Sequence, residues 1–124
     1  AGIAVRRWEG GFTKRSGIRA ASEILEELQD GDAIICLNDD MALGVYDVLQ
    51  NTSFRIGLDV SLTGFDKLEV TNYTQPKIAS VSYSKLDWGK SAARALLQLI
   101  DKRERTNAKI DSKFIVAGSV LQKK

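Results

Sequence analysis

Hydrophobic residues along the chain alternate between two spacings, which predict helices and strands in turn. Apolar side chains recur at helical intervals after residue 12, after residue 38 and from residue 85 to about residue 102. Short apolar runs lie between these segments and predict strands. The predicted strands are residues 3–5, 33–37, 59–65, 78–83 and 114–121. The order β-α-β-α-β-β-α-β predicts an α/β fold with a mostly parallel sheet flanked by helices.

Polar residues at the ends of the predicted elements support these boundaries. Thr13 or Ser16 can cap the first helix, and Ser84 with Asp87 has the spacing of a capping box before the third. The run 33–37 is apolar without interruption, which is typical of a parallel strand buried on both faces.

Composition narrows the functions that such a domain can have. The chain has 124 residues, of which 44% are hydrophobic, and this suits one domain with a packed core. It contains no histidine and one cysteine, Cys36, so we expect no metal site, no cofactor, no hydrolase triad and no internal disulfide. Cys36 lies in an apolar run and is expected to be buried. A lone cysteine favours a reducing compartment, and we expect a cytoplasmic protein.

Charge and hydropathy bear on the partners of this segment. The net charge is only +2, with basic and acidic residues interspersed, whereas a dedicated nucleic-acid surface is more strongly basic. No apolar stretch approaches the length that spans a bilayer. We therefore expect neither a membrane nor nucleic acid as a direct partner of these residues.

Three polar clusters lie where a predicted strand ends and a helix or loop begins. They cover residues 10–13, 38–40 and 64–66. Ligands of open parallel sheets bind at such strand ends, and these side chains suit a neutral, hydroxyl-rich or heterocyclic ligand. Structural roles remain open: Asn38 and Asp39 could cap the next helix, which spacing alone favours. Asp66 could organise a turn, and Phe12 could equally be a core residue.

Four short motifs follow one another along the chain. They are GGFTKRSG at residues 10–17, NDDMALG at 38–44, DVSLTGFD at 59–66 and PKIASV at 76–81. In this order they closely resemble the lac/gal repressor family of bacterial transcription regulators. The resemblance runs from about residue 10 to residue 120, and NDDMALG and DVSLTGFD together are its most specific part.

The resemblance implies a periplasmic-binding-protein-like effector domain, in which a ligand binds between two α/β subdomains joined by crossover strands. Residues 1–124 would be the C-terminal portion of that domain, and helix 85–102 would belong to the first subdomain, the rest of which would lie outside the chain. The DNA-binding helix-turn-helix would also lie outside it. The implied function is the ligand-sensing part of a repressor, without enzymatic activity, that allosterically controls operator binding.

The same resemblance implies an effector-binding role for four residues. Phe12 matches the position at which the family stacks an aromatic ring on its effector. Asn38 and Asp66 match positions that form hydrogen bonds with sugar hydroxyls or base atoms. Tyr83 lies on the crossover strand, where the family more often has glutamine or a similar polar residue. No catalytic residue is implied.

The implied partners are a sugar or nucleobase-like effector, operator DNA through the N-terminal domain outside this chain, and a second copy in a homodimer. In the family the dimer surface uses the helix after NDDMALG and the loop near residues 68–73. Helix 85–102 offers another route, because its apolar stripe would be exposed here and could be exchanged between chains. The residues of this stripe are Leu86, Ala93, Leu97 and Ile100.

Two other functions remain open. An exported sugar-binding protein of a transport system shares the implied fold, although Cys36 and the wording of residues 59–66 favour the regulator. A receiver-like phosphotransfer domain would place Asp39, Asp40 and Asp66 around Mg²⁺. This second alternative is the weaker one, because no lysine ends the predicted strand 78–83 to pair with a phosphoryl group.

Overall fold

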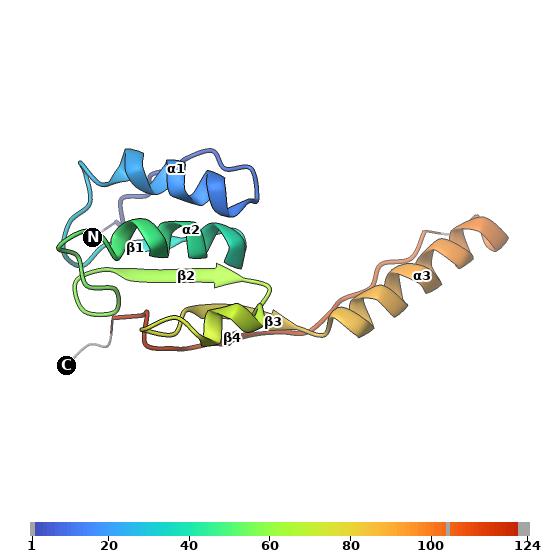
Figure 1. The fold of residues 1–124 in the computed structure, drawn as a ribbon. Helices are drawn as coiled ribbons and strands as arrows, with labels where there is room; N and C mark the ends of the chain where they lie inside the picture. Colours follow the sequence, from blue (N-terminus) through green and yellow to red (C-terminus); the bar gives the residue numbers. More distant parts are fainter. Residues whose placement is uncertain (1, 104, 122–124) are drawn as a thin grey trace.

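The computed structural model describes residues 2–103 and 105–121 and shows an α/β body from which one helix projects (Figure 1). The elements are α1 (Lys14–Ile24), β1 (Ala33–Ile35), α2 (Asp39–Leu49), β2 (Ser61–Phe65), the 3-10 helix η1 (Glu69–Asn72), β3 (Ala79–Tyr83), α3 (Lys85–Lys102) and β4 (Ser112–Ile115). The strands form one sheet in the order β1-β2-β3-β4. The first three are parallel and β4 is antiparallel to β3. The predicted fold class is confirmed.

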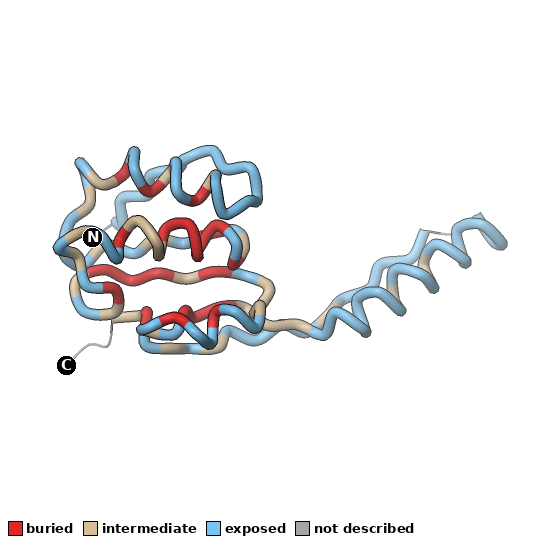
Figure 2. Tube along the Cα trace, viewed as in Figure 1, coloured by how far each residue is buried: buried red, intermediate tan, exposed pale blue. Residues whose placement is uncertain are grey.

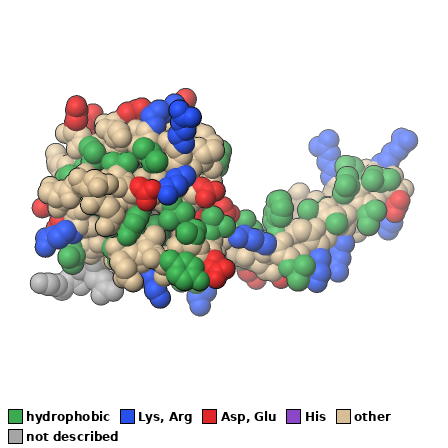
Figure 3. All heavy atoms as spheres, in the orientation of Figure 1, with side chains coloured by type: hydrophobic (Ala, Val, Ile, Leu, Met, Phe, Trp, Pro, Cys, Tyr) green, Lys and Arg blue, Asp and Glu red, His purple; other side chains and the backbone are tan. Residues whose placement is uncertain are grey.

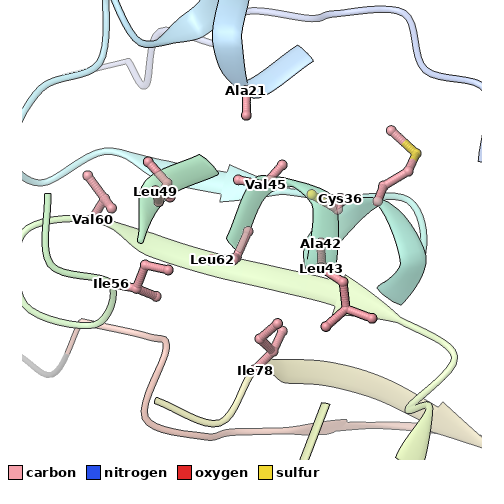
Figure 4. Packing of buried hydrophobic residues seen from close by; sticks show 11 residues of the cluster. Ala21, Cys36, Ala42, Leu43, Val45, Leu49, Ile56, Val60, Leu62 and Ile78 are labelled. Carbon is pink, nitrogen blue, oxygen red and sulfur yellow. The ribbon is translucent and has the colours of Figure 1, made fainter. Parts of the chain in front are cut away.

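The hydrophobic core lies between one face of this sheet and helix α2, with α1 packed on α2 from outside. Val45 and Leu49 of α2 and Leu62 of β2 are buried and belong to one cluster, which Ala21 of α1 also joins (Figure 4). Alternate residues of the parallel strands point to this face, which is why Leu62 is fully buried. The layers are therefore sheet, α2 and α1.

Helices α1 and α2 approach each other closely through glycine. A side chain at Gly17 would overlap the backbone of Met41, and one at Gly44 would overlap the backbone of Lys14. Both helices begin at the predicted caps. Thr13 and Ser16 form a reciprocal capping box at the start of α1.

Residues 3–5 are not the strand that the sequence predicts. No strand is assigned there, and Ile3 is 90% exposed. A strand needs a partner for its backbone groups, and within residues 2–103 and 105–121 the only strand paired with β1 is β2. Apolar alternation alone therefore overstated the number of strands.

The predicted burial of strand 33–37 on both faces is also wrong. Ile34 faces the core, but Ile35 is 77% exposed and Leu37 is exposed as well. The α-helices α1 and α2 lie on one face of the sheet (Figure 1), so the apolar residues on the other face stay open to solvent. The sequence shows that these residues are apolar, but it does not show whether another part of the molecule covers them.

All four strands of the sheet are shorter than predicted, β2 and β4 among them. β2 starts at residue 61 rather than 59, because Val60 closes a turn with Gly57, whose N–H donates to the Val60 carbonyl. β4 covers Ser112–Ile115 and ends six residues before the predicted limit of 121. There the chain turns inward, and Ser119 Oγ accepts from Ala79 N at 2.8 Å and donates to Leu62 O at 2.6 Å.

Helix α3 confirms the predicted helix 85–102 and lies outside the body. Ser84 caps it by accepting from Asp87 N, and all of its residues are described but none is buried (Figure 2). We call this projecting helix the arm. Figure 3 shows apolar side chains along the arm with basic side chains among them. Among the described helices, none combines the length and the hydropathy that crossing a membrane requires.

Candidate ligand-binding site

Three of the four predicted site residues follow or end neighbouring parallel strands. Asn38 comes after β1, Asp66 directly after β2, and Tyr83 is the last residue of β3. The strands run in the same direction, so these residues lie at one edge of the sheet. The backbone continues the pairing at this edge, where Asp66 N donates to Val81 O at 3.0 Å.

Asn38 connects the fourth residue, Phe12, to this edge. Its Oδ1 accepts from Met41 N at 2.9 Å and caps α2, and its Nδ2 donates to Phe12 O at 2.9 Å. The predicted capping role is therefore confirmed. Phe12 is not a core residue: it is 61% exposed and has a left-handed backbone with φ of 55°. An exposed ring on a fixed backbone can stack on a flat apolar surface.

Asp66 and Tyr83 form a direct pair. The Tyr83 hydroxyl donates to Asp66 Oδ1 at 2.9 Å, and the Tyr83 ring lies 5.7 Å from the ring of Phe65, centroid to centroid. The hydrogen bond to the Asp66 carboxylate raises the pKa of Tyr83, so the hydroxyl stays protonated. Asp66 Oδ2 has no donor among the described residues and can accept from a ligand hydroxyl or N–H.

Asp39 holds the backbone next to the site through buried hydrogen bonds, a role that the sequence analysis missed. The residue is fully buried, Oδ1 accepts from the Ser80 hydroxyl at 2.7 Å and Oδ2 accepts from Leu68 N at 2.6 Å. Burial raises the pKa of this carboxyl. Both oxygens are engaged within the protein, which argues against a Mg²⁺ site that would use Asp39. The motif NDDMALG does not reveal this buried role, because helix capping explains a polar residue at position 39 equally well.

A hollow of different character lies on the uncovered face of the sheet. Its volume is about 420 Å³. It is lined mainly by apolar side chains, among them Ile35, Leu37, Phe65, Val81 and Phe114. Cys36 borders it and is buried as predicted, and this burial raises the pKa of its thiol to about 12. The hydroxyl-bearing residues that line the hollow are few, Ser61 and Thr63, whereas the carboxylate, amide and phenol groups that could orient a polar ligand are concentrated at the strand ends.

Known proteins similar to this chain are bacterial transcription regulators. The family described as "Periplasmic binding protein-like domain" matches residues 2–119. The HTH-type transcriptional repressor PurR of Vibrio atlanticus is 35% identical over 96 residues, covering 77% of this chain and 29% of the relative. The ribose operon repressor of Haemophilus influenzae is 30% identical over 92 residues, covering 74% of this chain and 28% of the relative.

A solved structure supports the same relationship. The sugar-binding transcriptional regulator (LacI family) from Enterococcus faecalis superimposes with a TM-score of 0.80 at 34% identity, covering 91% of this chain and 43% of that one. The chain thus spans less than half of each of these proteins. It belongs to the periplasmic-binding-protein-like domain family and, within it, to the LacI (lac/gal repressor) family of transcription regulators, as its four motifs predict.

Proposed function

We propose that this chain is the effector-sensing part of a bacterial transcription repressor. In this proposal a sugar or a similar small polar molecule binds at the carboxyl ends of β1, β2 and β3. The observation that carries it is the assembly of Phe12, Asn38, Asp66 and Tyr83 at this edge, linked in two hydrogen-bonded pairs. Each brings a group that suits a ring bearing hydroxyls or ring nitrogens.

The chemistry of these groups favours a sugar or a nucleobase. The exposed face of Phe12 would cover the apolar side of the ligand ring, and Asp66 Oδ2 would accept a hydrogen bond from it. Asn38 has a second amide hydrogen with which to donate. The names of two relatives, a sugar-binding regulator and a ribose operon repressor, support a sugar in particular.

The rest of the regulator would complete the site and read it out. The chain covers 29% of the PurR relative, and we propose that the first effector subdomain and the helix-turn-helix belong to the remainder of a longer polypeptide. Helix α3 would then pack on the first subdomain, which would bury apolar residues such as Leu97 and Ile100 that are exposed here. Effector binding would change the angle between subdomains and shift the population of the DNA-binding state.

The proposed protein acts in the cytoplasm, as a homodimer on operator DNA, and catalyses no reaction. An exported sugar-binding protein would share the fold, as the description of the matching family as periplasmic binding protein-like indicates, and is the second candidate. The two differ in their readout. A regulator binds operator DNA in an effector-dependent way, whereas a transport protein has no DNA affinity.

A ligand screen on the longer polypeptide tests the proposal. We expect one sugar or nucleobase from a panel to raise the melting temperature, and D66A to weaken that ligand about tenfold or more by calorimetry. D30A is the control, because Asp30 is exposed at the opposite end of β1. Unchanged affinity in D66A would contradict the site, and a panel without any stabilising ligand would contradict the function.

A further inference from the structure

We propose that Asn38 and Asp39 position the two loops that carry Phe12 and Asp66. Each of these neighbouring residues at the start of α2 holds the backbone of one loop in place before any ligand is present. We call Asn38, Asp39 and Ser80 the brace. The ligand-binding role of Phe12 and Asp66 rests on the proposed function. The brace itself is a property of the chain without ligand.

The Asn38 half of the brace acts on the carbonyl of Phe12. Asn38 Oδ1 is occupied by Met41 N as the helix cap, and the separate donor Nδ2 reaches Phe12 O at 2.9 Å. One side chain thus fixes the start of α2 and the loop before α1 at the same time. The oxygen serves the helix, whereas the amide hydrogen serves the loop.

The Asp39 half acts on the two residues that follow Asp66. Lys67 N donates to Ser80 Oγ at 3.0 Å, and the Ser80 hydroxyl donates onward to Asp39 Oδ1. Leu68 N donates directly to Asp39 Oδ2 at 2.6 Å. Two successive backbone amides are therefore held by one buried carboxylate and its serine partner.

Both loops need such support because their backbones are unfavourable for residues with a side chain. Phe12 has φ of 55°, Asp66 has φ of 98° and Lys67 has φ of 49°. L-residues rarely adopt these left-handed conformations, and they persist where the surroundings impose them. The hydrogen bonds of the brace end on or beside each of these strained residues.

Close packing fixes the brace itself. Asp39 Oδ1 lies against β2 at Gly64, where an added Cβ would overlap the carboxylate. This contact explains why a glycine stands within the strand β2. Because Asn38 and Asp39 are consecutive, a displacement of the α2 start would move both loops, and with them both proposed ligand contacts.

Hydrogen–deuterium exchange of the 124-residue chain without ligand tests the inference. N38D keeps the capping oxygen and removes the donor to Phe12 O. We expect exchange in residues 10–16 to quicken about tenfold, while α2 keeps its protection and the melting temperature changes little. D39N leaves Leu68 N or the Ser80 hydroxyl without an acceptor, and we expect the same acceleration in residues 66–69 only.

Two further variants keep the test decisive. D40N is the control, because Asp40 is the exposed neighbour in the same helical turn, and both loops should exchange at the wild-type rate. If D39N fails to fold, S80A probes the same half of the brace and should quicken residues 66–69. Two results would overturn the inference. One is exchange within about twofold of the wild-type rate in residues 10–16 of N38D, and the other is such exchange in residues 66–69 of D39N or S80A. A failed ligand screen would leave it standing.

Discussion

Helices α2 and α3 have similar sequence patterns and opposite environments. Both carry apolar residues at helical spacing, and both begin at the caps that the sequence predicts. Seven of the 11 residues of α2 are buried, whereas none of the 18 residues of α3 is, and α3 projects beyond the sheet (Figure 2). An apolar stripe therefore predicts a helix with one apolar face. It does not predict whether another part of this chain covers that face.

Chain connection explains the difference between the two helices. α2 lies between β1 and β2, two neighbouring parallel strands, so it must cross back over the sheet that it joins. α3 lies between β3 and β4, which are antiparallel neighbours, and the chain can leave the sheet and return along the same path. Only the first connection forces a helix onto the sheet.

Matched leucine truncations should separate the two helices most strongly. Leu49 of α2 is 1% exposed and Leu97 of α3 is 59% exposed. L49A should lower the free energy of unfolding by about 2–5 kcal/mol, because it removes buried methyl groups and leaves a cavity. L97A should change it by less than about 0.5 kcal/mol in the monomeric chain. Urea unfolding at low protein concentration measures both, and similar losses in the two variants would contradict the contrast.

The sequence predicts the parts of this fold that depend on local signals. The caps at Thr13, Asn38 and Ser84 bond to amides within a few residues, so a short pattern contains both partners. Helix 85–102 is confirmed within its predicted limits. Residues 3–5 and the strand 33–37 depend instead on what lies beside them in space, and there the predictions of pairing and burial are wrong.

The candidate site divides along the same line. Parallel order places Asn38 and Asp66 at one edge of the sheet, and this follows from the sequence. The buried contacts of Asp39 do not, because Ser80 is 41 residues away along the chain. Its role depends on a tertiary approach between β3 and the start of α2. Helix capping is a sufficient local explanation for Asn38 and Asp39, so the sequence does not indicate a second role for Asp39.

Thiol reactivity can compare the body with the arm directly. Burial raises the pKa of Cys36 from 9.0 to about 12, so its thiolate fraction near neutral pH falls about a thousandfold. In the variant A93C a second thiol lies on the exposed surface of α3. We expect a thiol reagent to label the A93C site about a thousandfold faster than Cys36. Comparable rates would mean that the core around Cys36, between the sheet and α2, opens readily.

Self-association of the 124-residue chain should depend on the arm. Leu97 and Ile100 are exposed on one stripe of α3, and burial of such side chains between copies stabilises a complex. Replacing both by glutamate should weaken association by about 2 kcal/mol, or roughly thirtyfold. Q98E adds one negative charge outside the stripe, against two in the test variant, and should leave association unchanged. Sedimentation measures this, and a wild-type chain that stays monomeric at high concentration would contradict the prediction.

The smallest expected effect belongs to a surface ion pair of the body, Arg55 with Asp59. Arg55 donates to Asp59 Oδ2 from its backbone N–H and from Nε, both at 2.8 Å, and these bonds lower the pKa of Asp59 from 3.8 to about 2. A lowered pKa means that the ionised carboxylate favours the folded state. This contribution is complete above pH 3.8 and is lost as the pH falls toward 2.

D59N should therefore remove part of the loss of stability between pH 4 and pH 2, measured by urea midpoints. D101N on α3 is the control, because no ion pair to Asp101 occurs within residues 2–103 and 105–121. An equal change in both variants would show that net charge, rather than this pair, sets the acid response.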